Sequence, residues 1–158
     1  MLHIGFKKIL RNPANSGRDF VEFERKLCYS KDDWAMGRRG DAQMALRLRA
    51  ADPAGNVTLL VETPVSPGTY RAAAERLLAF SSLGGEQVGY LVPPRRGGDV
   101  RLEMMGGEFC GNALRCAALW AAERRGRGGE VAVEISGCGQ VLRADVRPDG
   151  EVWAEMPR

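Results

Sequence analysis

The segment from Ala113 to Ala122 is apolar on nearly every face, and Arg115 is its only charged residue. A helix on a protein surface would show a polar face, so this segment predicts a helix that other elements enclose. We expect the helix to begin near Gly111 and to run to about Arg125. Its many alanines let neighbouring strands approach closely. The rest of the domain must therefore be built around this helix.

The other expected elements are seven short strands and one amphipathic helix. Short β-branched runs and alternating patterns predict strands at residues 45–49, 57–62, 87–92, 100–105, 131–135, 140–146 and 151–156. Ser66-Pro67 is a typical helix start, and an apolar stripe follows it at Tyr70, Ala73, Ala74, Leu77 and Leu78. This inventory predicts an α+β fold, with a mostly antiparallel sheet wrapped around a central buried helix. A doubly wound parallel sheet is the weaker choice, because the pattern is not a repeated βαβ unit.

The first 45 residues differ from the rest of the chain. They lack sustained periodicity and mix charges with turn formers such as Asn12-Pro13. We expect residues 1–45 to be a poorly ordered or non-native extension, and residues 46–158 to form the working lobe. The extension carries nine Lys/Arg and six Asp/Glu, whereas the remainder carries 14 of each sign. A balanced lobe gives little support to nucleic-acid binding.

Composition excludes several other classes of protein. No apolar run approaches 18 residues and no secretory signal opens the chain, so we expect no membrane span and a cytoplasmic location. The only histidine is His3, which argues against a catalytic triad or a histidine-rich metal site in the lobe. The four cysteines show no C-x-x-C spacing, so we expect reduced thiols and no metal site.

The segment that suggests a reactive site is residues 106–116, in which glycines precede Cys110 at the start of the enclosed helix. The first amides of a helix lack internal partners and lie at the positive end of its dipole. Both effects favour a thiolate at Cys110, and the same amides can hold a substrate carboxylate. Gly111 permits close approach because it has no side chain. The competing interpretation is a small buried hydrophobe, which suits Cys116 better; Cys138 is expected in a turn.

Two further polar residues have both a structural and a functional interpretation. Asn56 ends a turn-forming run, and its amide could contact a substrate carboxylate or ammonium group. Glu86 follows Gly84-Gly85 and could be a surface charge or a pocket residue.

The run Glu108-Phe109-Cys110-Gly111-Asn112-Ala113 resembles the first cysteine motif of the diaminopimelate epimerase superfamily, whose members are cofactor-independent amino-acid racemases and epimerases. The lobe is most similar to the histidine racemases of opine-type metallophore synthesis. Further segments carry the resemblance in the same order, namely 53–58, 86–90, 136–138 and 156–157. The likeness covers about residues 46–158.

This resemblance implies two similar lobes, each contributing one cysteine to opposite faces of a free amino acid, without pyridoxal phosphate or metal. Cys110 would be one acid/base, and the backbone amides of Gly111 and Asn112 would bind the α-carboxylate. Asn56 would be a further polar contact, and Glu86 would lie near the substrate. The 158 residues contain no second motif of this kind. We therefore expect this chain alone to be inactive, and expect a second lobe, a partner chain or a homodimer to supply the opposite cysteine.

Two alternatives remain open at this point. The chain could belong to a true diaminopimelate epimerase of lysine and cell-wall synthesis, because Ala113 after Asn112 does not decide between the two enzymes. From a different class, it could be a non-catalytic amino-acid-binding or assembly module.

Overall fold

The computed structural model describes residues 21–28, 43–52, 56–79 and 84–157. Each of the seven expected strands overlaps an observed one, and both expected helices are present. The elements are β1 (Val21–Cys28), β2 (Gln43–Ala51), β3 (Thr58–Val61), η1 (Pro67–Thr69), α2 (Tyr70–Leu78), β4 (Gln87–Val92), β5 (Val100–Met104), α3 (Gly111–Arg124), β6 (Gly129–Ile135), β7 (Val141–Val146) and β8 (Val152–Ala154).

The eight strands form one sheet in which each strand pairs with its neighbour in the sequence. Five of the pairs are antiparallel, which confirms the expected mostly antiparallel sheet. The two parallel pairs are β3 with β4 and β5 with β6. Helix α2 connects the first pair and α3 the second. The helices explain the parallel pairs, since a crossover connection returns the chain to the same end of the sheet.

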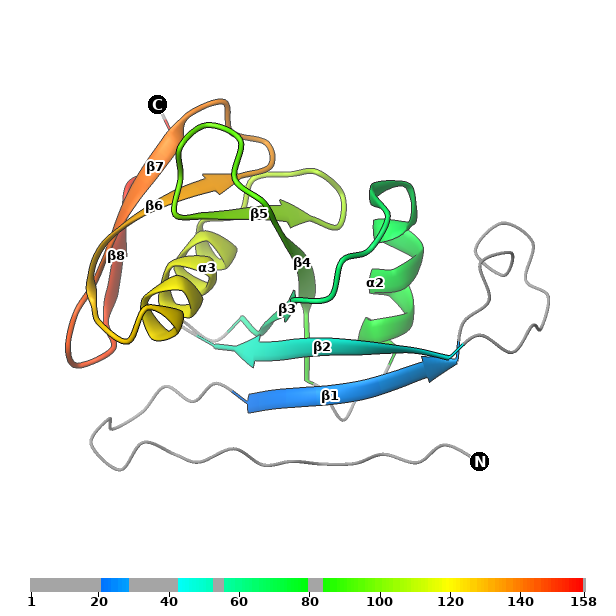
Figure 1. Cartoon of the computed structure of the whole chain (residues 1–158). Coiled ribbons are helices and arrows are strands. Elements are labelled where there is room, and N and C mark those ends of the chain that lie inside the picture. The colour runs from blue at the N-terminus through cyan, green and yellow to red at the C-terminus, as the bar shows by residue number, and fades with distance from the viewer. Residues whose placement is uncertain (1–20, 29–42, 53–55, 80–83, 158) are drawn as a thin grey trace.

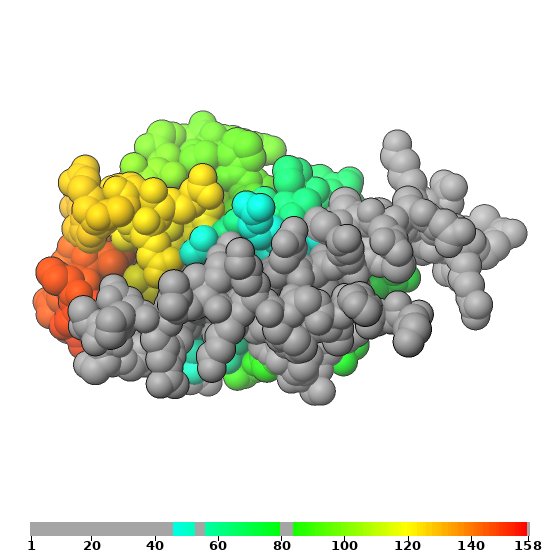
Figure 2. Space-filling view, turned by 60° about the horizontal axis from the view of Figure 1, so that its bottom comes forward, coloured from blue at the N-terminus to red at the C-terminus, as the bar shows by residue number. Residues whose placement is uncertain are grey.

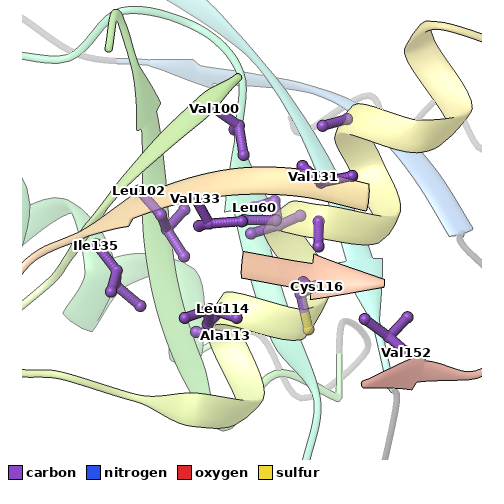
Figure 3. Close-up of a cluster of buried hydrophobic side chains, with 14 of the residues drawn as sticks. Leu60, Val100, Leu102, Ala113, Leu114, Cys116, Val131, Val133, Ile135 and Val152 are labelled. Atoms are coloured by element: carbon purple, nitrogen blue, oxygen red, sulfur yellow. The ribbon is translucent and has the colours of Figure 1, made fainter. Parts of the chain in front are cut away.

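Helix α3 lies within the curve of the sheet, as the sequence predicts (Figure 1). It contacts β3, β5, β6, β7 and β8. In Figure 3 the side chains of Leu60, Leu102 and Val133, from three different strands, lie around the helix. The buried residues of α3 cover most of its surface: Ala113, Leu114, Cys116, Ala117, Ala118, Ala121 and Ala122. This enclosure confirms the central buried helix and holds its first turn in place.

A second hydrophobic cluster packs α2 against the opposite face of β2 to β4. Leu59 and Val61 belong to this cluster, whereas Leu60 between them belongs to the cluster around α3. Alternation along β3 thus explains why all four of its residues are buried. The rings of Tyr70 and Tyr90 stack at 4.0 Å between centroids, and the Tyr90 hydroxyl donates to the Tyr70 carbonyl at 2.6 Å.

The C-terminal half of α3 is joined to β2 by ion pairs. Arg49 lies 3.0 Å from Glu123 on α3 and 2.8 Å from Glu62, which also accepts a hydrogen bond from the Trp120 indole. In the space-filling view the end of α3, in yellow, adjoins the surface of β2, in cyan (Figure 2). These contacts hold the helix in register with the sheet at the end opposite Cys110.

Strand β1 was not among the expected elements, yet it pairs with β2 along its whole length. Residues 1–20 and 29–42 lie outside the described residues, whereas Cys28 is the last residue of β1. The division of the chain at residue 45 therefore stays a prediction. Near α2, the expected helix start at Ser66 becomes the single 3-10 turn η1, and the α-helix itself begins at Tyr70.

Candidate functional site

Cys110 is the last residue of the loop that connects β5 to α3. It is the N-cap of the helix, with extended backbone angles of φ −140° and ψ 112°. Its Sγ accepts a hydrogen bond from the backbone N–H of Ala113 at 3.5 Å. A side chain that turns back in this way satisfies one of the four helix amides that have no internal partner. The sulfur thus faces the helical amides, and Cys110 as a residue is half-buried.

A second contact to Cys110 comes from the sheet. The Cys110 thiol donates a hydrogen bond to Oε1 of Gln87 at 3.2 Å, and Nε2 of Gln87 donates to Oγ1 of Thr58 at 2.7 Å. Thr58 and Gln87 are directly opposite each other in the parallel pair β3–β4. Thr58 is fully buried, so it gives the Gln87 amide a fixed point of attachment. The sequence placed Gln87 and Thr58 only within the segments 86–90 and 53–58 that carry the resemblance, and it indicated no contact of either residue with Cys110.

Cys116 lies one and a half turns farther along α3 and has a different environment. It is fully buried in the core around α3 (Figure 3), and its thiol lies 3.9 Å from the Ala51 carbonyl. Burial raises the pKa of the Cys116 thiol to about 12, although a hydrogen bond with the Thr58 side chain acts in the opposite direction. This cysteine is structural, as the sequence predicts.

Asn112 and Asn56 are brought together, although 56 positions separate them in sequence. Nδ2 of Asn112 donates to the backbone carbonyl of Asn56 at 2.7 Å. The contact therefore uses the Asn56 backbone, and its exposed side chain is left at the surface. Glu86 is also exposed, and its backbone N–H donates to the Val57 carbonyl at 2.9 Å. Residues 56 and 86 thus border the first turn of α3 without contacting Cys110 through their side chains.

The loop that carries Cys110 is supported from β6 and the turn after it. Ser136 Oγ accepts from the Met104 amide at 2.8 Å and donates to the Glu108 carbonyl at 2.9 Å. Gly137 packs against the Glu108–Phe109 peptide so closely that a side chain there would overlap it. Cys138 follows in the turn and its thiol lies 3.6 Å from the Gln140 carbonyl. Ser136 and Gly137 therefore position the loop that carries Cys110.

Met156 lies over Gly111 at the start of α3. A Cβ built on Gly111 would lie 3.0 Å from the Met156 Cε and 3.1 Å from its Sδ. Met156 is 47% exposed, so this thioether forms part of the surface beside Cys110. No local pattern in the sequence links residues 111 and 156, since their proximity depends on the pairing of β8 with β7.

A cavity of about 600 Å³ opens elsewhere, beside α2 and the Tyr70–Tyr90 stack. Arg95, Glu103 and Met105 line it, and Cys110 is not among its lining residues. The candidate site lies instead around the first turn of α3, where Cys110, Gly111 and Asn112 are half-buried.

In the described ranges, no group of three or more His, Cys, Asp or Glu side chains is arranged to hold a metal ion. Within the same ranges, neither helix has the length and apolar character needed to cross a membrane.

Comparisons with known proteins agree with the resemblance expected from the sequence. The chain is similar to a histidine racemase from Fusobacterium nucleatum, with 36% identity over 103 residues that cover 63% of this chain and 37% of the relative. It is 29% identical to a histidine racemase from Staphylococcus aureus over 110 residues, 68% of this chain and 40% of that protein. A diaminopimelate epimerase from Magnetococcus marinus is 36% identical over 106 residues, 62% of this chain and 36% of that protein.

The matched region thus spans 36–40% of the length of these relatives. Residues 46–157 match the family described as the histidine racemase CntK N-terminal domain. That match includes the sheet from β3 to β8, both helices and the loop that carries Cys110. Since it extends over more than half of the chain, the chain belongs to this family of amino-acid racemase N-terminal domains.

Proposed function

We propose that this chain supplies one half of an amino-acid racemase or epimerase active site, in which Cys110 exchanges a proton with the substrate α-carbon. The observation that carries the proposal is the placement of the Cys110 sulfur at the N-terminus of the buried helix α3, 3.5 Å from the Ala113 amide. Cys110 is half-buried and not sealed in the core as Cys116 is, which supports a role in contact with a small molecule.

The proposed reaction consists of two proton transfers. The Cys110 thiolate takes the α-proton, the Cα–H bond breaks, and its electron pair stays on the substrate as a carbanion. A thiol on the opposite face then donates its proton to that carbon and becomes a thiolate. The configuration inverts, and no redox step or external reagent is needed. In the reverse direction Cys110 starts as the thiol and acts as the acid.

The substrate carboxylate would be held at the start of α3. The first amides of the helix, including those of Gly111 and Asn112, lie at the positive end of its dipole. Asn56 borders this turn through the contact of its carbonyl with Asn112, which supports its assignment as a further polar contact. Glu86 is the weaker assignment, because it is exposed and its side chain does not contact Cys110 in the structure.

Histidine is the first substrate to test, because the matching family and two relatives carry that name. Diaminopimelate is the second, since one relative at 36% identity is named for it. In both cases the ligand is a free amino acid, and neither pyridoxal phosphate nor a metal takes part in the proposed mechanism.

The opposite cysteine would come from a second lobe or from a partner chain. Inversion needs a proton donor on the face of the α-carbon that Cys110 does not reach. We therefore expect a single copy of residues 1–158 to be poorly active or inactive. Addition of a second lobe, covalently or as a separate chain, should restore turnover.

The decisive experiment follows the α-hydrogen of L-histidine and of diaminopimelate in deuterated water, with this chain joined to its second lobe. Wild type should incorporate deuterium and form the other stereoisomer, whereas Cys110→Ala should do neither. Cys138→Ala is the control and should leave exchange nearly unchanged, because the described hydrogen bond of the Cys138 thiol is with the Gln140 carbonyl and not with the Cys110 loop. Exchange that persists in Cys110→Ala would refute the proposal. Tight amino-acid binding without any exchange would favour the non-catalytic binding module.

A further inference from the structure

We propose that the Gln87 side-chain amide, attached to Thr58, reverses its orientation with the protonation state of Cys110, so that it contacts both the thiol and the thiolate. This inference rests on the proposed function, in which Cys110 is a thiolate in one direction of the reaction and a thiol in the other. Gln87 is thereby a positioning residue for the sulfur, not a group that exchanges the substrate proton.

The structure captures the arrangement suited to the neutral thiol. The Cys110 S–H donates to Gln87 Oε1 at 3.2 Å, while Gln87 Nε2 donates to Thr58 Oγ1 at 2.7 Å. Every group in this chain of hydrogen bonds has a partner of the right kind. When the thiol loses its proton, Oε1 would face a negatively charged sulfur with no hydrogen between them, which is unfavourable.

A half-turn of the terminal amide removes this conflict. Nε2 then donates to the thiolate, and Oε1 accepts a hydrogen bond from the Thr58 hydroxyl. A hydroxyl can both donate and accept, so Thr58 can be the partner of either end of the amide. The terminal torsion of glutamine is broad and roughly two-fold, so the two orientations are both accessible to the side chain.

Because Thr58 is buried, its hydroxyl remains the partner of the Gln87 amide in both orientations. Thr58 is 0% exposed and lies opposite Gln87 in the β3–β4 pair, so water cannot replace its hydroxyl. Cys116, the thiol that interacts electrostatically with Cys110, has its pKa raised to about 12 by burial and remains neutral. The other acidic groups near this region include Asp52, Glu86 and Glu108, all exposed. None of them is changed in the variants below.

Replacement of Gln87 distinguishes a reversing amide from a fixed one by the sign of its effect. A reversing amide stabilises the thiolate through a charge-assisted hydrogen bond, so Gln87→Leu should make Cys110 harder to ionise. A fixed amide, with Oε1 always toward the sulfur, opposes ionisation, so the same substitution should make Cys110 easier to ionise. Thr58→Val should shift ionisation in the same direction as Gln87→Leu but less, because the amide remains and loses its attachment. The substitution also removes the hydrogen bond between Thr58 and Cys116, which stays neutral in the core.

The test is the pH dependence of iodoacetamide alkylation at Cys110 in the 158-residue chain, followed by peptide mass spectrometry. We expect Gln87→Leu to raise the midpoint by about one pH unit, which is about tenfold slower alkylation at pH 7. Thr58→Ser, which keeps the hydroxyl, should behave as wild type. Gln140→Leu, which removes an exposed amide, is the control. A midpoint that falls or does not move in Gln87→Leu would overturn the proposal.

A second measurement is made on the wild-type chain. The side-chain NH2 protons of Gln87 in ¹⁵N-labelled wild-type chain should shift with pH at the midpoint of Cys110 alkylation. The same protons should show no such transition in Cys110→Ser. Absence of a transition in wild type would refute the reversal. Both readouts are independent of substrate, so a chain that fails to racemise amino acids could still pass them, and the two proposals fail separately.

Discussion

Gly137 lies directly against the peptide between Glu108 and Phe109, two residues before Cys110. A Cβ on Gly137 would be 2.7 Å from the Glu108 carbonyl carbon and closer still to the Phe109 nitrogen. The φ of Gly137 is +70°, a left-handed conformation that favours glycine. The turn after β6 and the loop before α3 therefore determine each other's positions.

Gly137→Ala should consequently destabilise the protein and displace the loop that carries Cys110. We expect a loss of about 2–4 kcal/mol in the free energy of unfolding, from backbone strain and overlap together. Urea denaturation measures it. Gly139→Ala is the matched control, because nothing lies within 4 Å of its Cβ position. Equal stability of the two variants would contradict the packing described here.

Glu134 should make stability depend on pH in the acid range. Its carboxylate is fully buried, and burial alone would raise its pKa. Hydrogen bonds from the amides of Arg95, Gly98 and Arg96, with the Arg96 charge, outweigh burial and lower the pKa below the usual 4.5. A lowered folded-state pKa contributes stability above about pH 4.5 that is lost as pH falls through the folded-state value.

Glu134→Gln should therefore cost roughly 2 kcal/mol at pH 7, since an amide cannot replace the charge-assisted bonds. The difference from wild type should shrink as the pH is lowered below about 4.5. Urea midpoints from pH 3 to pH 7 give this comparison. Glu130→Gln on the same strand is the control, because Glu130 is exposed and pairs only with Arg143 among the described contacts. A difference that grows toward low pH would disprove the sign.

Cys110 and Cys116 should differ strongly in thiol reactivity within one molecule. The buried Cys116, with its pKa raised to about 12, has very little thiolate at pH 8 and no access to reagent. We expect it to alkylate on the order of a hundredfold or more slowly than Cys110 in the folded chain. In urea the two rates should converge. Comparable rates in the folded chain would place Cys116 outside the core.

Substitutions of Asn112 should show how a charge at the first turn of α3 affects substrate binding. Asn112→Asp removes the donor to the Asn56 carbonyl and places a negatively charged oxygen against that carbonyl. The helix dipole offsets part of this repulsion, so we expect a loss of about 1–2 kcal/mol in the free energy of unfolding. That charge repels a substrate carboxylate, so KM of the two-lobed enzyme should rise at least tenfold. Asn112→Ala removes the same donor without charge and should raise KM much less. An equal rise in both variants would argue against carboxylate binding at this turn.

The sequence by itself determined both helices, seven of the eight strands in the described residues, and the position of Cys110 at the start of α3. The continuous apolar character of residues 113–122 requires enclosure wherever the helix lies, and glycines with Cys110 define its start through interactions within a few residues. The parallel pairs were not deduced, because seven strand-like patterns do not state which ends of the strands meet. Strand β1 was missed because its alternation of apolar and polar residues covers only Val21 to Glu24 and stops at Arg25-Lys26, and because its pairing partner is β2.

Only the tertiary structure decided which side chains surround Cys110. Gln87 lies 23 positions before it, and Thr58 lies a further 29 positions before Gln87. Their contacts arise from the register of β3 with β4 and from the seating of α3 against that pair. Gly137 and Met156 reach the site through the turns and pairings of β6 to β8. Such contacts depend on how the sheet curves around the helix, and short-range patterns along the chain do not predict that curvature.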